Sequence, residues 1–130
     1  MLFRSGKCKF VDDYEVCEGI STIYLGGHSV CSQAIKIATE YGPLVITSDD
    51  IYHYSLLESA IVPRLCTTVD NIKQTNRRLA EMVLNEGAIL FPLHDPLVAE
   101  LYEKYGDQWV KVARDLSLVA ANGFMANSDA

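Results

Sequence analysis

The sequence predicts an α+β or α/β fold in which a mixed β-sheet carries helices on one of its faces. Short segments rich in β-branched and aromatic residues fill the first 48 residues, and a long amphipathic segment follows in the second half. The chain has 130 residues, 49% of them hydrophobic and 22% charged, which suits one packed domain. Strands followed by helices are typical of a sheet that buries one face against helices.

The strands are predicted from short apolar or alternating segments that end at turn-forming residues. Gly26-Gly27 follows one of these segments, and Tyr41-Gly42-Pro43 separates two others. The predicted strands cover residues 7–10, 22–25, 33–39, 44–47 and 89–92.

The clearest helix is predicted over residues 69–86. Thr67 and Asp70 have the spacing of a capping box at its start, and Gly87 suits the left-handed residue after its last turn. The apolar side chains expected on its buried face are Ile72, Leu79, Met82 and Val83.

Shorter helical segments are expected within residues 51–60 and over residues 96–105. No repeat, low-complexity tract or linker divides the chain. We therefore expect one domain over residues 1–120 and a flexible tail over residues 121–130.

Composition argues against several kinds of partner. The formal net charge of −6 disfavours binding to nucleic acid phosphates. No apolar run is long enough for a transmembrane helix, and the first residues lack the apolar core of a signal peptide. A cytoplasmic location without a membrane partner is therefore expected. Cys8, Cys17, Cys31 and Cys66 show no C-x-x-C spacing and are expected to be reduced thiols.

Ligand-type side chains follow three of the predicted strands. His28, Asp49 and His94 each come directly after a short apolar strand. Loops at strand ends commonly hold catalytic and binding side chains, so these three are candidate site residues. Two imidazoles and a carboxylate suit zinc, iron or manganese. Asp50 and Asp95 could orient neighbouring imidazoles by accepting their hydrogen bonds.

Each candidate also has an ordinary interpretation, which the residues alone leave open. A histidine in a loop is usually a solvated side chain, and an aspartate between a strand and a helix is commonly an N-cap. Spacing does not join the three side chains, because 21 residues separate His28 from Asp49 and 45 separate Asp49 from His94. His53, the third histidine, is expected to be solvated or to lie beside the site.

Three motifs occur in order at these positions: residues 26–33 (GGHSVCSQ), 45–49 (VITSD) and 91–96 (FPLHDP). They resemble the Gly-His-Thr-Pro-Gly turn, the strand ending in a metal-bridging aspartate, and the late Pro-Gly-His-Asp turn of the metallo-β-lactamase superfamily. The resemblance is closest to the lactonase-like branch, which includes acyl-homoserine lactone hydrolases. It covers about residues 7–105 and implies the C-terminal half of that family's αββα sandwich.

The resemblance also implies roles for individual residues. His28 would bind one metal ion, His94 would bind a second, and Asp49 would bridge both. Tyr52 would point its hydroxyl at the substrate carbonyl; a core aromatic on the short helix is the alternative interpretation. Weakly held zinc is the cofactor implied, and metal-dependent hydrolysis of a lactone, ester or related bond is the activity implied.

The main signature of that superfamily, H-x-H-x-D-H, is absent from the sequence. Each metal ion would keep one histidine and a share of Asp49, so we expect a hydrolase fragment or subunit with little or no activity alone. The alternatives are a non-catalytic, self-associating protein with relic metal residues and a small binding module unrelated to metals. Half a sandwich would expose an apolar sheet face. We therefore expect a homodimer through that face, or pairing with a separately encoded N-terminal half.

Overall fold

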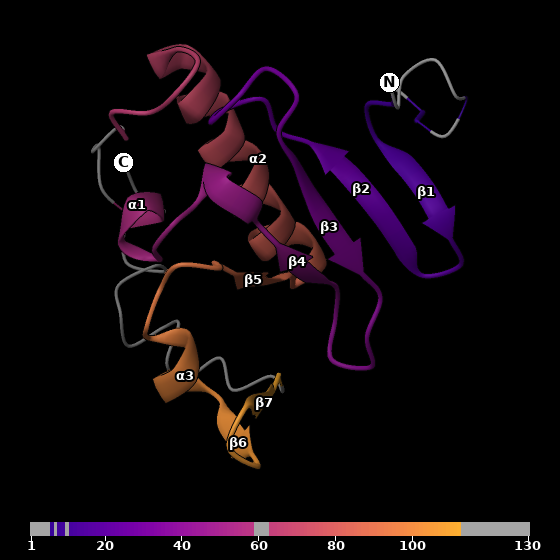
Figure 1. Cartoon of the computed structure of the whole chain (residues 1–130), viewed down its shortest axis with the longest axis vertical. Helices are drawn as coiled ribbons and strands as arrows, with labels where there is room; N and C mark the ends of the chain where they lie inside the picture. Colours follow the sequence, from indigo (N-terminus) through magenta and orange to yellow (C-terminus); the bar gives the residue numbers. More distant parts are fainter. Residues whose placement is uncertain (1–5, 7, 10, 59–62, 113–130) are drawn as a thin grey trace.

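A five-stranded mixed sheet forms the centre of the fold. The computed structural model describes residues 6, 8–9, 11–58 and 63–112. The strands, in their order across the sheet, are β1 (Tyr14–Cys17), β2 (Ile20–Tyr24), β3 (Gln33–Ile37), β4 (Leu44–Ile46) and β5 (Ile89–Phe91) (Figure 1). Neighbours from β1 to β4 are antiparallel, whereas β5 pairs parallel with β4. The predicted mixed sheet is confirmed, but its first strand is β1, which the sequence pattern missed. Of the strand predicted over residues 7–10, Cys8 and Lys9 are not in a strand, and residues 7 and 10 lie outside the described residues.

Helix α2 (Val69–Glu86) has the predicted bounds but not the predicted N-cap. The hydroxyl of Thr68 accepts a hydrogen bond from the backbone N–H of Asn71 at 3.1 Å. Gly87 ends the helix in the left-handed conformation, with a φ of 65°. Thr67, which the sequence pattern favoured as the cap, instead donates its hydroxyl hydrogen to the loop after β2.

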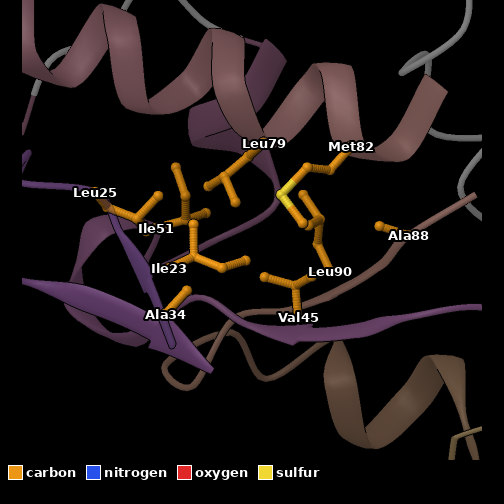
Figure 2. Packing of buried hydrophobic residues seen from close by; sticks show 9 residues of the cluster. All are labelled: Ile23, Leu25, Ala34, Val45, Ile51, Leu79, Met82, Ala88 and Leu90. Atoms are coloured by element: carbon orange, nitrogen blue, oxygen red, sulfur yellow. The ribbon is translucent and has the colours of Figure 1, made fainter. Parts of the chain in front are cut away.

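α2 packs on one face of the sheet, and the hydrophobic core lies between them (Figure 2). Of the predicted apolar stripe, Ile72, Leu79 and Met82 are buried, and Val83 is half-buried against the core. Burying these side chains between a helix and a sheet is the main favourable term in folding. The buried cluster consists of Ile23, Leu25, Ala34, Val45, Ile51, Leu79, Met82, Ala88 and Leu90.

The segment after β4 forms less helix than predicted. It contains the 3-10 turn η2 (Ser48–Asp50) and the short helix α1 (Ser55–Glu58). Residues 59–60 of the predicted helical segment lie outside the described residues.

The helix predicted over residues 96–105 is wrong beyond its first half. α3 (Val98–Leu101) is followed by a two-stranded hairpin of β6 (Glu103–Tyr105) and β7 (Trp109–Lys111). The aromatic and β-branched residues Tyr105, Trp109 and Val110 favour the extended conformation here, and a turn over residues 106–108 closes the hairpin. The predicted tail and the end of the predicted domain lie outside the described residues.

None of the helices in the described ranges is long and apolar enough to cross a membrane.

The face of the sheet turned away from α2 is apolar. Strand register places Tyr14, Thr22, Ile35, Ile46 and Phe91 in one row across all five strands. Among the described residues of this face, Tyr14 and Ile20 are 38% exposed and Ile35 is 43% exposed. We call this surface the open face, because its central strands keep large apolar side chains in solvent. It consists of Tyr14, Ile20, Thr22, Tyr24, Gln33, Ile35, Ile37, Leu44, Ile46, Ile89 and Phe91, of which Ile89 is buried.

The packing of α2 on the sheet leads to a first prediction. Replacing Leu79 by Ala should lower the free energy of unfolding by about 2.7–5 kcal/mol, because the side chain is fully buried and would leave a cavity. Urea denaturation followed by circular dichroism measures this loss. Leu84→Ala on the same helix is the control: Leu84 is 59% exposed, so its loss should stay within about 0.5 kcal/mol. Equal losses in the two variants would contradict the described packing.

Candidate functional site

The strand directions bring three loops to one edge of the sheet. β2 and β4 are both antiparallel to β3, and β5 is parallel to β4, so β2, β4 and β5 run the same way. Their carboxyl ends therefore lie along the same edge. His28, Asp49 and His94 follow these three ends, and each lies within a few residues of its strand.

The carboxylate of Asp49 lies between the two imidazoles. Its Oδ1 is 2.9 Å from Nε2 of His94, and its Oδ2 is 4.0 Å from Nε2 of His28. All three side chains are partly exposed. Asp49 does not cap a helix: Thr47 precedes η2 and makes no capping hydrogen bond with its side chain. The structure thus brings together the three side chains that sequence spacing alone could not join.

Tyr52 lies beside both imidazoles rather than on α1. Its ring centroid is 5.8 Å from that of His28 in an edge-on arrangement and 5.1 Å from that of His94. The Tyr52 hydroxyl is 3.1 Å from Nδ1 of His28. Desolvation, followed by the negative charges of Asp49 and Asp50, raises the pKa of the Tyr52 hydroxyl above its usual value. The hydroxyl therefore keeps its proton at neutral pH.

The contacts of His28 assign its ring hydrogen. Nδ1 lies 3.2 Å from the carbonyl oxygen of Leu65, which can only accept a hydrogen bond. Nδ1 is therefore the donor in this contact, and Nε2 is the ring nitrogen that faces Asp49. Because Nδ1 carries this hydrogen, the Tyr52 oxygen can only accept from it, and the Tyr52 hydrogen is left to donate elsewhere.

The other polar residues near these loops do different things from those the sequence suggested. Asp50 makes no hydrogen bond to an imidazole in the described part of the chain, because its Oδ1 accepts from backbone N–H groups of the loop after β2. Asp95 lies 3.8 Å from Nδ1 of His53, outside the group formed by Asp49 and its two histidines, and it accepts hydrogen bonds from Tyr54 and Leu97 N–H. His53 is therefore a half-exposed neighbour of Asp95.

Asp50 is the residue at this edge whose role sequence reasoning missed. It is only 1% exposed, and its Oδ1 accepts hydrogen bonds from Gly27 N, His28 N and the Ser32 hydroxyl at 2.8, 2.8 and 3.0 Å. Ser48, just before the Asp49-Asp50 pair, has a left-handed φ of 55°, which costs about 1–2 kcal/mol in a non-glycine residue. The sequence signal for this role was the pair of adjacent acidic residues after an apolar strand. Neighbouring side chains point in different directions, so one of the two could be expected to point into the protein.

The donor types suit a divalent metal ion, but the donors do not converge on one point. Each oxygen of Asp49 faces a different imidazole nitrogen. Within the described ranges, no three His, Cys, Asp or Glu side chains are placed so that they could hold one ion together. Two imidazoles therefore flank one carboxylate here, and the three side chains do not form a single closed site.

Solved structures with this fold include metal-dependent hydrolases. An N-acyl homoserine lactone hydrolase with the product N-hexanoyl-L-homoserine at its catalytic metal centre is 29% identical, with a TM-score of 0.63 over 74% of this chain and 38% of that one. The B. thuringiensis protein AiiA, in a variant with N-decanoyl-L-homoserine at its active site, gives the same values. A probable metal-dependent hydrolase from Staphylococcus aureus is 20% identical, with a TM-score of 0.61 over 70% and 33%.

These similarities define the class of fold. The chain is an α+β unit with a mixed five-stranded sheet, consistent with part of a metallo-β-lactamase-like αββα fold. It spans 38% of the length of the lactone hydrolase with bound product. Neither family models nor curated protein sequences give a match.

The close approach at Gly27 leads to a second prediction. A Cβ at this position would lie 2.8 Å from Asp50 Oδ1, 2.9 Å from Thr75 Oγ1 and 3.0 Å from Ile72 Cδ1. Gly27→Ala should therefore lower the free energy of unfolding by about 1–3 kcal/mol, measured by thermal or urea denaturation. Val30→Ala, on the exposed part of the same turn, is the control and should cost less than about 0.5 kcal/mol. A Gly27→Ala variant as stable as the wild type would contradict this loop geometry.

Proposed function

We propose that this chain supplies half of the site of a metal-dependent hydrolase of the lactonase type. The observation that carries the proposal is the position of Asp49, whose two oxygens face imidazoles from loops far away in sequence. The similarity to lactone hydrolases, at 29% identity over 74% of the chain, supports the same class of reaction. A lactone, ester or related carbonyl compound is the proposed substrate.

In this proposal, His28, Asp49 and His94 would hold the metal ions. A metal ion bound there would polarise the substrate carbonyl and lower the pKa of bound water. The side chain of Tyr52 adds a hydrogen-bond donor, because its hydrogen is not used by His28 and its pKa is raised. Tyr52 would donate this hydrogen bond to the substrate carbonyl oxygen.

The chain alone should be a poor catalyst. One imidazole and one carboxylate oxygen for each ion fall short of the three protein ligands that a catalytic zinc usually has. The partly exposed ligands also leave water free to compete with protein donors. We therefore propose weak zinc binding and little or no hydrolysis by the isolated chain. The alternative function is a non-catalytic self-associating protein that keeps these side chains as relics, and the open face favours it.

Zinc titration separates these two functions and is the third prediction. Zinc at about ten times its dissociation constant should stabilise the isolated chain by about 1.4 kcal/mol, because it binds the folded state. Differential scanning fluorimetry with and without a chelator measures the shift in Tm. The variants His28→Asn, Asp49→Asn and His94→Asn should each reduce the shift.

His53→Asn is the matched control, because His53 lies outside the group around Asp49. All the variants keep the free thiols, of which Cys8, Cys17 and Cys31 are exposed, so zinc held by thiols contributes equally to each measurement. No zinc-dependent shift in the wild-type chain, or an equal loss in the His53 variant, would favour the non-catalytic function. Stoichiometric, tightly held zinc in the purified chain together with lactone turnover would contradict the half-site.

We further propose that a second β-rich half covers the open face in the functional protein. The lactone hydrolase with bound product is much longer than this chain, which spans 38% of it, so the larger part of such a fold lies outside the compared region. The exposed Ile35 and its row neighbours are the kind of surface that another sheet buries. In the isolated chain, a second copy would take this place in a two-fold dimer.

Light scattering tests this as the fourth prediction. The isolated chain should be a dimer at micromolar concentration, and Ile35→Lys should shift it toward monomer, because a charge would be buried in the middle of the contact. Leu84→Lys, on the solvent side of α2, is the control and should leave the dimer intact. A wild-type monomer, or dimers unaffected by Ile35→Lys, would count against this use of the open face.

A further inference from the structure

We propose that Asp50 is a positioning residue, which holds the loop after β2 so that the His28 imidazole faces Asp49. Asp50 and Asp49 are neighbours in sequence, yet their carboxylates have different surroundings. Asp49 is partly exposed beside the imidazoles, whereas Asp50 is 1% exposed and faces backbone groups. The loop after β4 is therefore linked to the loop after β2 by the buried side chain of Asp50, which neighbours the exposed Asp49.

The N–H groups of this loop are fixed by one oxygen atom. Asp50 Oδ1 accepts hydrogen bonds from the backbone N–H of Gly27 and His28, both at 2.8 Å, and from the Ser32 hydroxyl at 3.0 Å. Ser32 Oγ lies 2.9 Å from the carbonyl oxygen of Ser29 as well. Asp50 therefore holds both ends of the turn around His28 through one oxygen atom.

The carbonyl groups of the same loop are fixed from the opposite side. The Thr67 hydroxyl donates to the carbonyl oxygens of Gly26 and Gly27, at 2.8 and 2.9 Å, and Thr67 N donates to Gly27 O at 2.8 Å. Leu65, two residues earlier, offers its carbonyl oxygen to His28 Nδ1. The N–H groups of Gly27 and His28 and the carbonyl groups of Gly26 and Gly27 are therefore all bound by residues from outside the β2–β3 hairpin.

This arrangement determines the direction of the imidazole as well as the stability of the loop. The His28 backbone is held by Asp50 through its N–H, and the His28 ring is held by Leu65 through Nδ1. Displacing the backbone would take Nδ1 away from the Leu65 oxygen and turn Nε2 away from Asp49. A residue that only stabilised the fold would have no such effect on the ring.

The fifth prediction concerns the ring of His28 in the metal-free chain. Long-range proton–nitrogen NMR spectra of the nitrogen-15-labelled chain should show the Nδ1–H form of His28, with the signals assigned from His28→Gln. Asp50→Ala should shift His28 toward the mixed forms of a solvated imidazole. Asp50→Asn should keep the wild-type pattern, because its amide oxygen can accept the same three hydrogen bonds.

A zinc measurement adds a second readout, which rests on the proposed function. Asp50→Ala should weaken zinc binding by about 10–100-fold, as is typical when a residue orienting a ligand is lost, and Asp50→Asn should remain close to wild type. Leu79→Ala is the matched control. It removes a core side chain that takes no part in the loop contacts, so it should lower Tm but leave both the ring signals and zinc binding unchanged.

The outcomes distinguish the positioning role of Asp50 from the proposed function. A folded Asp50→Ala protein with the wild-type ring pattern would overturn the positioning role. If Asp50→Ala does not fold, Asp50→Ser decides, because its side chain leaves a smaller gap than that of alanine but cannot accept the same three hydrogen bonds: displaced His28 signals in the folded Asp50→Ser protein would support the role, and the wild-type pattern would overturn it. A wild-type chain that binds no zinc, but whose His28 signals depend on Asp50, would contradict the proposed function and still support the positioning role.

Discussion

The buried carboxylate of Asp50 is the constraint on which the geometry of the candidate site depends. A charged group removed from water is costly unless it is well hydrogen-bonded. Here one oxygen accepts three hydrogen bonds, whereas Oδ2 is buried without a partner among the described residues. The stabilisation therefore comes through Oδ1 alone, and all of it acts on the loop that carries His28. Asp49 directly precedes Asp50 in the chain. The same short segment therefore carries Asp49 and, through Asp50, holds the loop of His28.

The order of the strands explains how the short segment with Asp49 and Asp50 can position the candidate site. β2 and β4 run in the same direction with β3 between them, so their following loops lie at one edge but one strand apart. A single side chain of aspartate length bridges that gap when it points inward. The left-handed Ser48 and the turn η2 then direct Asp49 outward, toward His94 at the end of β5. Local backbone strain and the order of the strands thus act together.

Sequence patterns predicted the elements that depend on local residues. The helix over 69–86 was predicted because its apolar spacing and Gly87 are local signals, and the strands around Ile23, Ile35 and Val45 were found for the same reason. Sequence patterns failed to predict the role of a residue where that role depends on a hydrogen-bond partner far away in the sequence. Thr67 is a residue type that commonly caps helices, but its hydroxyl donates to a carbonyl group of the loop after β2. Thr68 is the N-cap instead. The role of Asp50 likewise depends on N–H groups 22 and 23 residues away.

Two incomplete features of the chain have one physical explanation. The open face leaves apolar side chains such as Ile35 in water, and the ligand sets around Asp49 each contain one imidazole only. A second β-rich half packed on the sheet would bury the open face. Loops at the edge of that half could add metal ligands to those around Asp49. It would also exclude water, which strengthens every charge interaction around Asp49. In our proposal, covering the sheet and completing the site are therefore a single event, and weak metal binding by the isolated chain follows from the exposed face itself.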